Sequence, residues 1–99
     1  MFEVSVIIPS FNRAGTLKLC LEGLKKQTLS FDRFEVICVN DCSTDGTDEV
    51  MKEALKELPG KYYEHKKNFG PGATRNTGLE NSQGKYFLSF ISIEFLLNL

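Results

Sequence analysis

This sequence of 99 residues has little net charge and no long apolar run. Its formal net charge is −1, so it lacks the basic field that attracts nucleic acid or anionic lipid. The longest apolar stretch, residues 86–99, is shorter than the roughly 20 residues that cross a bilayer, and Ser89 and Glu94 interrupt it. No N-terminal segment combines a basic and an apolar region as signal peptides do. We therefore expect a cytoplasmic protein with no nucleic-acid partner and no membrane insertion.

Cysteine is scarce, and its number is odd. The three cysteines are Cys20, Cys38 and Cys42, which argues against a disulfide framework. The Cys38-x-x-x-Cys42 spacing would need a second pair of ligands to hold a metal ion, and that pair is lacking. We expect Cys38 to be buried in a strand and Cys20 to lie on the apolar face of a helix.

The signatures of common phosphate and catalytic sites are missing as well. The sequence contains neither G-x-G-x-x-G after its first strand-like run nor G-x-x-x-x-G-K-[ST]. Its single histidine, His65, stands beside Lys66 and Lys67 on a weak strand. We expect it to be a solvated surface residue rather than a catalyst. No Ser/His/Asp catalytic set can be assembled.

What the sequence does contain is a regular alternation of strand and helix patterns. Short β-branched runs alternate with segments whose apolar residues recur at helical spacing. These patterns predict strands at residues 4–8, 34–39, 61–66 and 86–93, and helices near 17–26, 47–58 and 71–81. Thr47 is the expected N-cap of the second helix. Such alternation is typical of an α/β domain with a mostly parallel sheet flanked by helices, and residues 1–99 are expected to form a single domain.

Polar residues follow the predicted strands at the edge where ligands bind to parallel sheets. Residues 9–12 follow the first strand, 40–43 follow the second, and 68–75 precede the third helix. Asp41 can accept a hydrogen bond from a base or a sugar, and Arg75 can bind a diphosphate through its rigid set of donors. Asp41 can equally serve as a turn or helix-cap residue, and composition alone leaves both roles open.

Four segments resemble family 2 glycosyltransferases, which have the GT-A fold. Residues 4–13 (VSVIIPSFNR) are similar to the opening of that family. The pattern Leu21-x-x-Leu24-x-x-Gln27-Thr28 resembles the end of its first helix, and residues 34–47 (FEVICVNDCSTDGT) resemble its second strand and acidic turn. Residues 68–78 (NFGPGATRNTG) resemble its glycine-rich stretch. Each segment alone is a weak signal, but the four occur in family order and spacing and cover residues 4 to about 90.

The resemblance implies a site for a nucleotide-diphosphate sugar. In the family, the Pro9 segment and the aromatic residue at Phe11 flank the base, and the carboxylate at Asp41 accepts a hydrogen bond from it. The arginine that matches Arg75 lies near the diphosphate or the ribose. This sequence has Asn40 where the family usually has another aspartate, so an acceptor remains but the charge is lost. The residues expected to bind the nucleotide are Pro9, Phe11, Asn12, Asn40, Asp41, Ser43 and Arg75.

The resemblance fails near the end of the sequence. A D-x-D element of the family binds Mn²⁺ or Mg²⁺ on the diphosphate, but Ile91 and Ile93 stand at its two aspartate positions. Hydrocarbon side chains cannot bind a hard cation, and Glu94 alone is a poor site. We therefore expect no metal cofactor for this chain. We also expect no catalytic residue, because the family's base comes from a second half that this chain does not contain.

Three explanations of this ending compete. The chain is truncated or out of frame, so that residues from about 91 are not native; or it is a natural remnant; or it is a complete small protein that uses the nucleotide-binding half differently. We favour the first, because the match fails abruptly. Apolar residues between 86 and 99 then lack their usual partners, so we expect self-association through the C-terminal strand and tail. A tail folded back over the sheet as a short helix is the alternative.

These observations together predict the donor-binding half of an inverting family 2 glycosyltransferase. Such an enzyme transfers a sugar from a nucleotide-diphosphate sugar to an acceptor, and a UDP-sugar is the expected donor. The chain alone is expected to be inactive. A non-catalytic module that binds a nucleotide or a nucleotide-sugar, or an inactive fragment, is the alternative.

Overall fold

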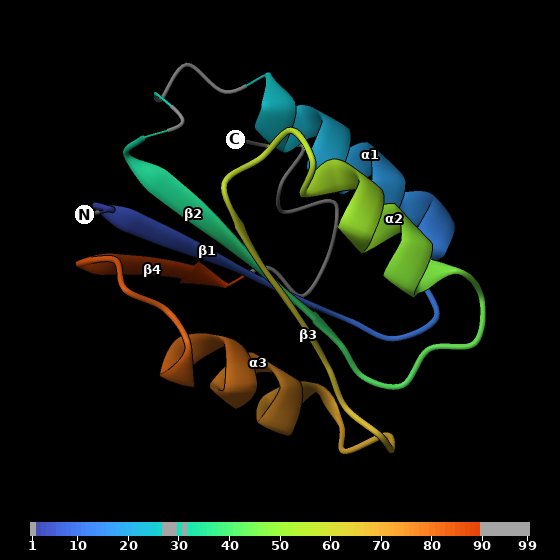
Figure 1. Cartoon of the computed structure of the whole chain (residues 1–99). Coiled ribbons are helices and arrows are strands. Elements are labelled where there is room, and N and C mark those ends of the chain that lie inside the picture. Colours follow the sequence, from blue (N-terminus) through green and yellow to red (C-terminus); the bar gives the residue numbers. More distant parts are fainter. Residues whose placement is uncertain (1, 27–29, 31, 90–99) are drawn as a thin grey trace.

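The structure, a computed structural model, describes residues 2–26, 30 and 32–89. They form a four-stranded sheet with helices on both faces (Figure 1). In chain order, the elements are β1 (Val4–Ser10), α1 (Ala14–Lys25), β2 (Phe34–Asn40), α2 (Thr47–Ala54), β3 (Gly60–Glu64), α3 (Pro71–Glu80) and β4 (Tyr86–Ser89). The predicted alternation of strands and helices is thus confirmed over the described residues. Residues 90–93 of the predicted last strand lie outside them.

The sheet has the strand order β3-β2-β1-β4, and each of its three pairings is parallel. β1 pairs with β2 along its whole length, from Val4 opposite Phe34 to Ser10 opposite Asn40. Parallel pairing places the carboxyl ends of β1, β2 and β3 at one edge of the sheet. This arrangement confirms the predicted α/β class with a mostly parallel sheet.

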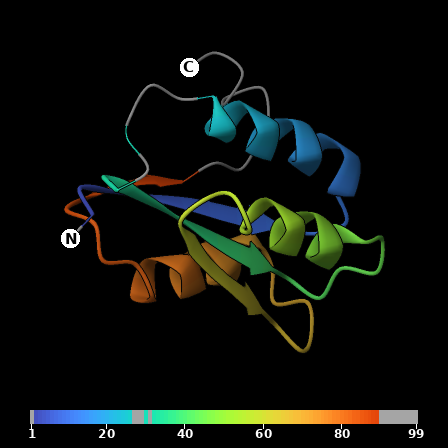
Figure 2. The ribbon, with the colours of Figure 1, turned by 45° about the horizontal axis from the view of Figure 1, so that its top comes forward.

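The two faces of the sheet are covered unequally. α1 and α2 lie on one face and α3 lies on the other (Figure 2). Val6 and Ile8 of β1 belong to the large core cluster with α1 and α2, whereas Ile7 belongs to a small cluster with Ile37 and Val39 on the α3 side. All seven residues of β2 are buried, as expected for a central strand covered on both faces.

β1 extends two residues beyond its predicted end and includes Pro9. The Asp41 N–H donates a hydrogen bond to the Ser10 carbonyl, so the backbone groups of Ser10 face β2. Backbone groups of successive strand residues point to opposite sides, so the nitrogen of Pro9 faces away from β2. The missing N–H of the proline therefore costs the β1–β2 ladder no hydrogen bond, and the strand continues.

The start of α2 differs from the prediction. Thr47 is the first helical residue, and Gly46 occupies the N-cap position with a positive φ of 90°. The carboxylate of Asp45 accepts hydrogen bonds from both the Thr47 N–H (3.1 Å) and the Thr47 hydroxyl (2.5 Å). Asp45 therefore takes the capping role that the pattern assigned to Thr47.

A buried carboxylate joins the amino ends of the strands. Glu35 of β2 accepts hydrogen bonds from the Ser5 hydroxyl (2.7 Å) and the Gln83 N–H (2.6 Å). The Ser5 hydroxyl oxygen in turn accepts a hydrogen bond from the Gly84 N–H (2.8 Å). This Glu35–Ser5 clamp ties the connection between α3 and β4 to the two central strands, at the end of the sheet opposite Asp41.

The cysteines lie where the pattern placed them. Cys38 is buried in β2 and Cys20 is buried on α1, while Cys42 is partly exposed, and all three are free thiols. Burial raises the pKa of Cys20 to about 11 and that of Cys38 to about 12, which makes both thiols poor nucleophiles. Among the described residues, no helix has the length and apolar character needed to cross a membrane. The cytoplasmic location stays a prediction.

Candidate functional site

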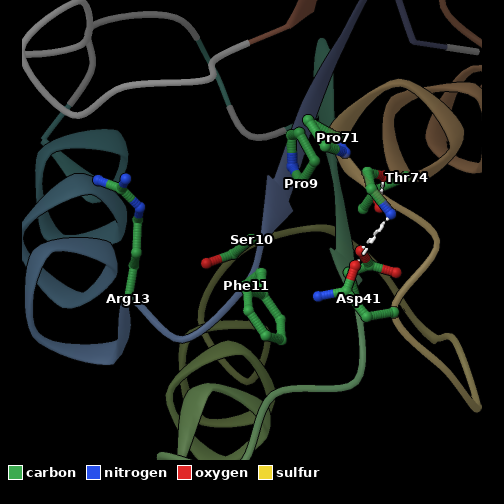
Figure 3. Close-up of a pocket in the computed structure, with 9 residues that line it drawn as sticks. Pro9, Ser10, Phe11, Arg13, Asp41, Pro71 and Thr74 are labelled. Atoms are coloured by element: carbon green, nitrogen blue, oxygen red, sulfur yellow. Dashed lines mark hydrogen bonds between the residues drawn. The ribbon is translucent and has the colours of Figure 1, made fainter.

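An open pocket of about 420 Å³ lies at the carboxyl edge of the sheet. Three segments meet there: the end of β1, the residue that follows β2, and the loop that leads into α3. Figure 3 shows the β1 side chains near the middle, with α1 on one side and α3 on the other. The sequence placed the candidate site at this edge. The pocket is lined by Pro9, Ser10, Phe11, Arg13, Asp41, Asn68, Gly70, Pro71 and Thr74.

Asp41 is only 2% exposed, and its carboxylate is held by three hydrogen bonds. Oδ1 accepts from the Phe69 N–H (2.9 Å) and lies 2.8 Å from Nδ1 of His65. Oδ2 accepts from the Gly70 N–H (2.8 Å). Burial raises the pKa of Asp41, but the hydrogen bonds from Phe69, His65 and Gly70 outweigh burial and bring the pKa below its ordinary value. Asp41 is therefore ionised at neutral pH.

Asp41 occupies a position that is compatible with both roles that the sequence left open. It lines the pocket, as a ligand-binding residue would. It also fixes the loop before α3, as a turn residue would. Gly70 at the N-cap of α3 has a φ of 95°, in the region that favours glycine, and its carbonyl accepts a hydrogen bond from the Thr74 hydroxyl (2.6 Å). The carboxylate thus determines where α3 begins relative to the sheet.

The prediction that His65 is a solvated surface residue is wrong. Its side chain is 14% exposed, and its backbone N–H donates to the Asn40 carbonyl (2.9 Å) at the end of β2. Nδ1 lies 2.8 Å from Asp41, and Nε2 lies 2.8 Å from the Thr77 hydroxyl on α3. The sequence alone does not give this position, because it depends on the register of β3 against β2. Parallel pairing of Glu64 with Asn40 brings the next residue of each strand together, which places His65 beside Asp41.

Asn12 and Ser43 build the loops beneath the pocket rather than lining it. The Asn12 N–H donates to the Ser43 hydroxyl oxygen (2.9 Å), and Oδ1 of Asn12 accepts from the Thr44 N–H (2.8 Å). A third bond between the same loops runs from the Ala14 N–H to Asp45 (3.1 Å). The loops after β1 and β2 are thereby tied together, and the start of α1 is fixed against them.

Asn40 also serves the fold locally. It is buried, and its amide nitrogen donates to the Tyr62 hydroxyl (3.1 Å) while Oδ1 accepts from the Ser43 N–H (3.0 Å). Asn40 does not line the pocket. Its donor and its acceptor are both engaged, which an aspartate at this position could not match because it has no donor.

Arg75 lies outside the pocket lining, on an exposed part of α3. Thr74, one residue earlier, is buried and lines the pocket instead. Successive residues of a helix point about 100° apart, so the buried position of Thr74 turns Arg75 outward. Of the seven residues expected to bind a nucleotide, Pro9, Phe11 and Asp41 are brought together here.

Ser10, the last residue of β1, and Arg13, which precedes α1, line the pocket but were not among the residues expected to bind a nucleotide. Ser10 is buried against the pocket, and Arg13 precedes α1 with an exposed side chain. Arg13 projects from the α1 side of the site, opposite Asp41 (Figure 3). The sequence held their signal, because both lie at or just beyond the carboxyl end of β1, the edge where ligands bind to parallel sheets. The pocket therefore combines a carboxylate, a guanidinium and the 43% exposed ring of Phe11.

The described residues of this chain offer no group of side chains that fits a divalent metal. Within the part of the chain that the structure describes, no three His, Cys, Asp or Glu side chains are grouped so that they could hold a metal ion. Ile91 and Ile93, the positions that the family resemblance matches to the D-x-D element, lie outside that part, and neither side chain has a donor atom. The expectation that this chain uses no metal stays a prediction.

Comparisons with a family model and with known proteins both indicate a glycosyltransferase family. The family model of glycosyl transferase family 2 matches residues 5–90. An uncharacterized glycosyltransferase of Rickettsia bellii is 43% identical over 85% of this chain and 12% of its own length. The poly(ribitol-phosphate) beta-N-acetylglucosaminyltransferase TarS of Staphylococcus aureus is 33% identical over 97% of this chain and 17% of its own length. The chain thus spans less than a fifth of these two relatives.

Solved structures of related enzymes share the fold. A crystal structure of S. aureus TarS 1-349 in complex with UDP superposes with a TM-score of 0.83 at 33% identity, over 89% of this chain and 27% of that one. The mannosyltransferase PcManGT from Pyrobaculum calidifontis, in complex with GDP-Man and Mn²⁺, gives a TM-score of 0.76 at 27% identity, over 82% of this chain and 24% of that one.

Proposed function

Because this chain belongs to glycosyl transferase family 2, we propose that its pocket binds the nucleotide of a nucleotide-diphosphate sugar. Its fold is a partial GT-A fold. A UDP-sugar is the donor we propose. This choice is supported by TarS structures with bound UDP and UDP-GlcNAc, which are 33% and 32% identical to the chain. Neither the sugar nor the acceptor follows from these likenesses.

The observation that carries the proposal is the meeting of Phe11, Asp41 and Arg13 around one pocket. The exposed ring of Phe11 offers an apolar face on which a base can stack. Oδ2 of Asp41 accepts a single hydrogen bond from Gly70, so a lone pair remains for an N–H of a base. Arg13 adds a positive charge suited to a diphosphate.

Arg75 is a second cation that could contact the diphosphate, from outside the pocket. Because it stands on α3 outside the pocket lining, we propose that it reaches a bound diphosphate only from the outer rim. Arg13 and Arg75 are then alternative cations for the same phosphates. Replacing each by glutamine separates them, since the cation that contacts the diphosphate should weaken UDP binding much more than it weakens uridine binding.

We propose that sugar transfer requires a protein of the length of the relatives, of which this chain covers less than a fifth. We propose that such a protein moves the sugar to its acceptor with inversion, and that the present chain supplies the donor-binding half. We also propose that the chain alone transfers no sugar, because it covers only 12–17% of the length of relatives such as TarS. Turnover of UDP-GlcNAc by the purified chain would contradict this.

A second candidate function is nucleotide-sugar binding without transfer. It is favoured by Ile91 and Ile93, which remove both metal ligands that the family uses. Introducing Ile91→Asp together with Ile93→Asp should make UDP binding depend on Mn²⁺ if these positions match the D-x-D element. Tight Mn²⁺ binding by the unchanged chain would show that the match is wrong.

Titration of the chain with UDP tests the proposed pocket. UDP should shift backbone NMR signals of residues 9–13 and 68–74, and Phe11→Ala should weaken binding about 10-fold or more through loss of a stacking partner. Leu19→Ala is the matched control, because Leu19 is an exposed apolar residue on α1 that does not line the pocket. No binding at millimolar UDP, or equal losses in both variants, would contradict the proposal.

A further inference from the structure

We propose that His65 is a positioning residue of this pocket, whose Nδ1–H fixes the Asp41 carboxylate and, through it, the loop of residues 68–70. The test that uses UDP as the probe rests on the proposed function. The positioning itself concerns this chain's own residues and can be measured without any ligand.

The first support is the number of elements that meet at one side chain. His65 follows β3, and its ring lies 2.8 Å from Asp41 beyond β2 and 2.8 Å from Thr77 on α3. The ring also packs against Phe69 in an edge-to-face contact, with centroids 5.3 Å apart. A side chain that is 14% exposed and engaged at both nitrogens does not move independently of the pocket.

The second support is the position of the proton on the ring. Asp41 is ionised and can only accept hydrogen bonds, so Nδ1 of His65 must carry a hydrogen to lie 2.8 Å from Oδ1. Nε2 faces the Thr77 hydroxyl, which can either donate to Nε2 or accept from it. In the second case, Thr77 donates to the Ala73 carbonyl (3.2 Å) instead. The bond to Asp41 therefore exists with the ring neutral or charged.

The third support comes from the two other hydrogen-bond donors to the Asp41 carboxylate. Its other two donors, the N–H groups of Phe69 and Gly70, belong to the loop that the carboxylate itself organises. Asp41 is bonded to the sheet through its own backbone N–H, but these two donors cannot orient its carboxylate relative to the sheet. His65 can, because its backbone N–H is bonded to the Asn40 carbonyl at the end of β2. His65 thus connects the end of β2 to the Asp41 carboxylate, and through it to the loop of residues 68–70.

Two substitutions separate the two ring nitrogens. The amide nitrogen of His65→Asn can replace Nδ1 and keep the bond to Asp41, whereas that of His65→Gln replaces Nε2 and keeps only the contact to Thr77. We expect His65→Asn to bind UDP within about 3-fold of the wild type. We expect His65→Gln to bind about 10-fold or more weakly, the loss expected for a hydrogen bond to a charged group. Equal affinities of the two variants would overturn the proposal, provided that both fold.

A ligand-free measurement decides the proposal if either variant fails to fold or if UDP does not bind. The ¹⁵N shifts of the wild-type imidazole should show a protonated Nδ1 throughout the neutral range. Where the variants fold, the amide signals of Phe69 and Gly70 should move in His65→Gln and stay near their wild-type positions in His65→Asn. An unprotonated Nδ1 would overturn the positioning role. Absence of UDP binding together with these signals would contradict the proposed function alone.

Discussion

Gly78 of α3 lies directly against Ile7 of β1: a Cβ atom at residue 78 would stand 2.3 Å from Cγ2 of Ile7. Ile7 is fully buried and cannot move aside without disturbing Ile37 and Val39 in the same cluster. The absence of a side chain at residue 78 therefore sets how closely α3 approaches the sheet. Because Pro71 and Thr74 line the pocket from the same helix, this contact also sets the width of the site.

Gly78→Ala should destabilise the domain despite the better helix propensity of alanine. Overpacking a buried contact costs about 1–3 kcal/mol, which exceeds the roughly 1 kcal/mol that alanine contributes in a helix. Gly72→Ala on the same helix is the control, since a Cβ there meets nothing within 4 Å. Urea denaturation should lower the free energy of unfolding for Gly78→Ala and leave it unchanged or raised for Gly72→Ala. The same sign for both variants would refute the close contact.

Cys42→Gly should stabilise the domain. Cys42 has a φ of 64°, a left-handed conformation that costs a non-glycine residue roughly 1–2 kcal/mol. The greater freedom of glycine in the unfolded chain and the loss of the weak bond from Cys42 Sγ to the Lys66 carbonyl (3.5 Å) offset part of this, so we expect a gain of about 0.5–1 kcal/mol in urea denaturation. Asn12→Gly relieves a similar φ of 50° but removes the acceptor of the Thr44 N–H, so it should not stabilise. A gain of equal size in both variants would contradict this account.

Asp41 should make stability fall steeply in acid. Its pKa in the folded protein lies below its ordinary value, so the contribution of Asp41 is complete above a pH of about 4 and is lost as the pH falls through the folded pKa. Asp41→Asn should reduce the free energy of unfolding by about 1–3 kcal/mol at neutral pH and lose less of it in acid. Urea denaturation followed by circular dichroism over this pH range measures both. Parallel profiles would show that Asp41 contributes nothing to the acid sensitivity.

The exposed side of β4 should support self-association. Tyr86 and Phe87 are exposed large aromatic residues, and β4 is the last strand of the described sheet beside β1. Charges placed on an edge strand oppose pairing between sheets, so Phe87→Lys should lower the mass measured by light scattering across a concentration series. Leu19→Lys, which changes an exposed leucine of α1, should leave that mass unchanged. A wild-type chain that stays monomeric at high concentration would contradict the prediction. The tail from residue 90 lies outside the described residues.

The sequence predicted the elements and the edge of the sheet well because both depend on local patterns. Apolar periodicity and turn residues mark where elements lie, and parallel pairing then determines which loops share an edge. Asp41 was identified for this reason. The residues that each side chain contacts could not be predicted from local patterns, because these contacts depend on how the elements pack. His65 was misplaced because its burial depends on the pairing of β3 beside β2. Arg75 was expected at the site, but the packing of Thr74 turns it away from the pocket lining.

The Glu35–Ser5 clamp has a consequence for the order in which the chain folds. β1 and β2 pair across a separation of 30 residues, whereas the Gly84 N–H reaches Ser5 across 79. Longer loops cost more entropy to close, so the nearer pair should form first. The acceptors for Gln83 and Gly84 come together only when that pair exists, so the last strand should dock late. Substitutions that remove only the bonds from Gln83 and Gly84 should therefore speed unfolding while leaving the refolding rate nearly unchanged.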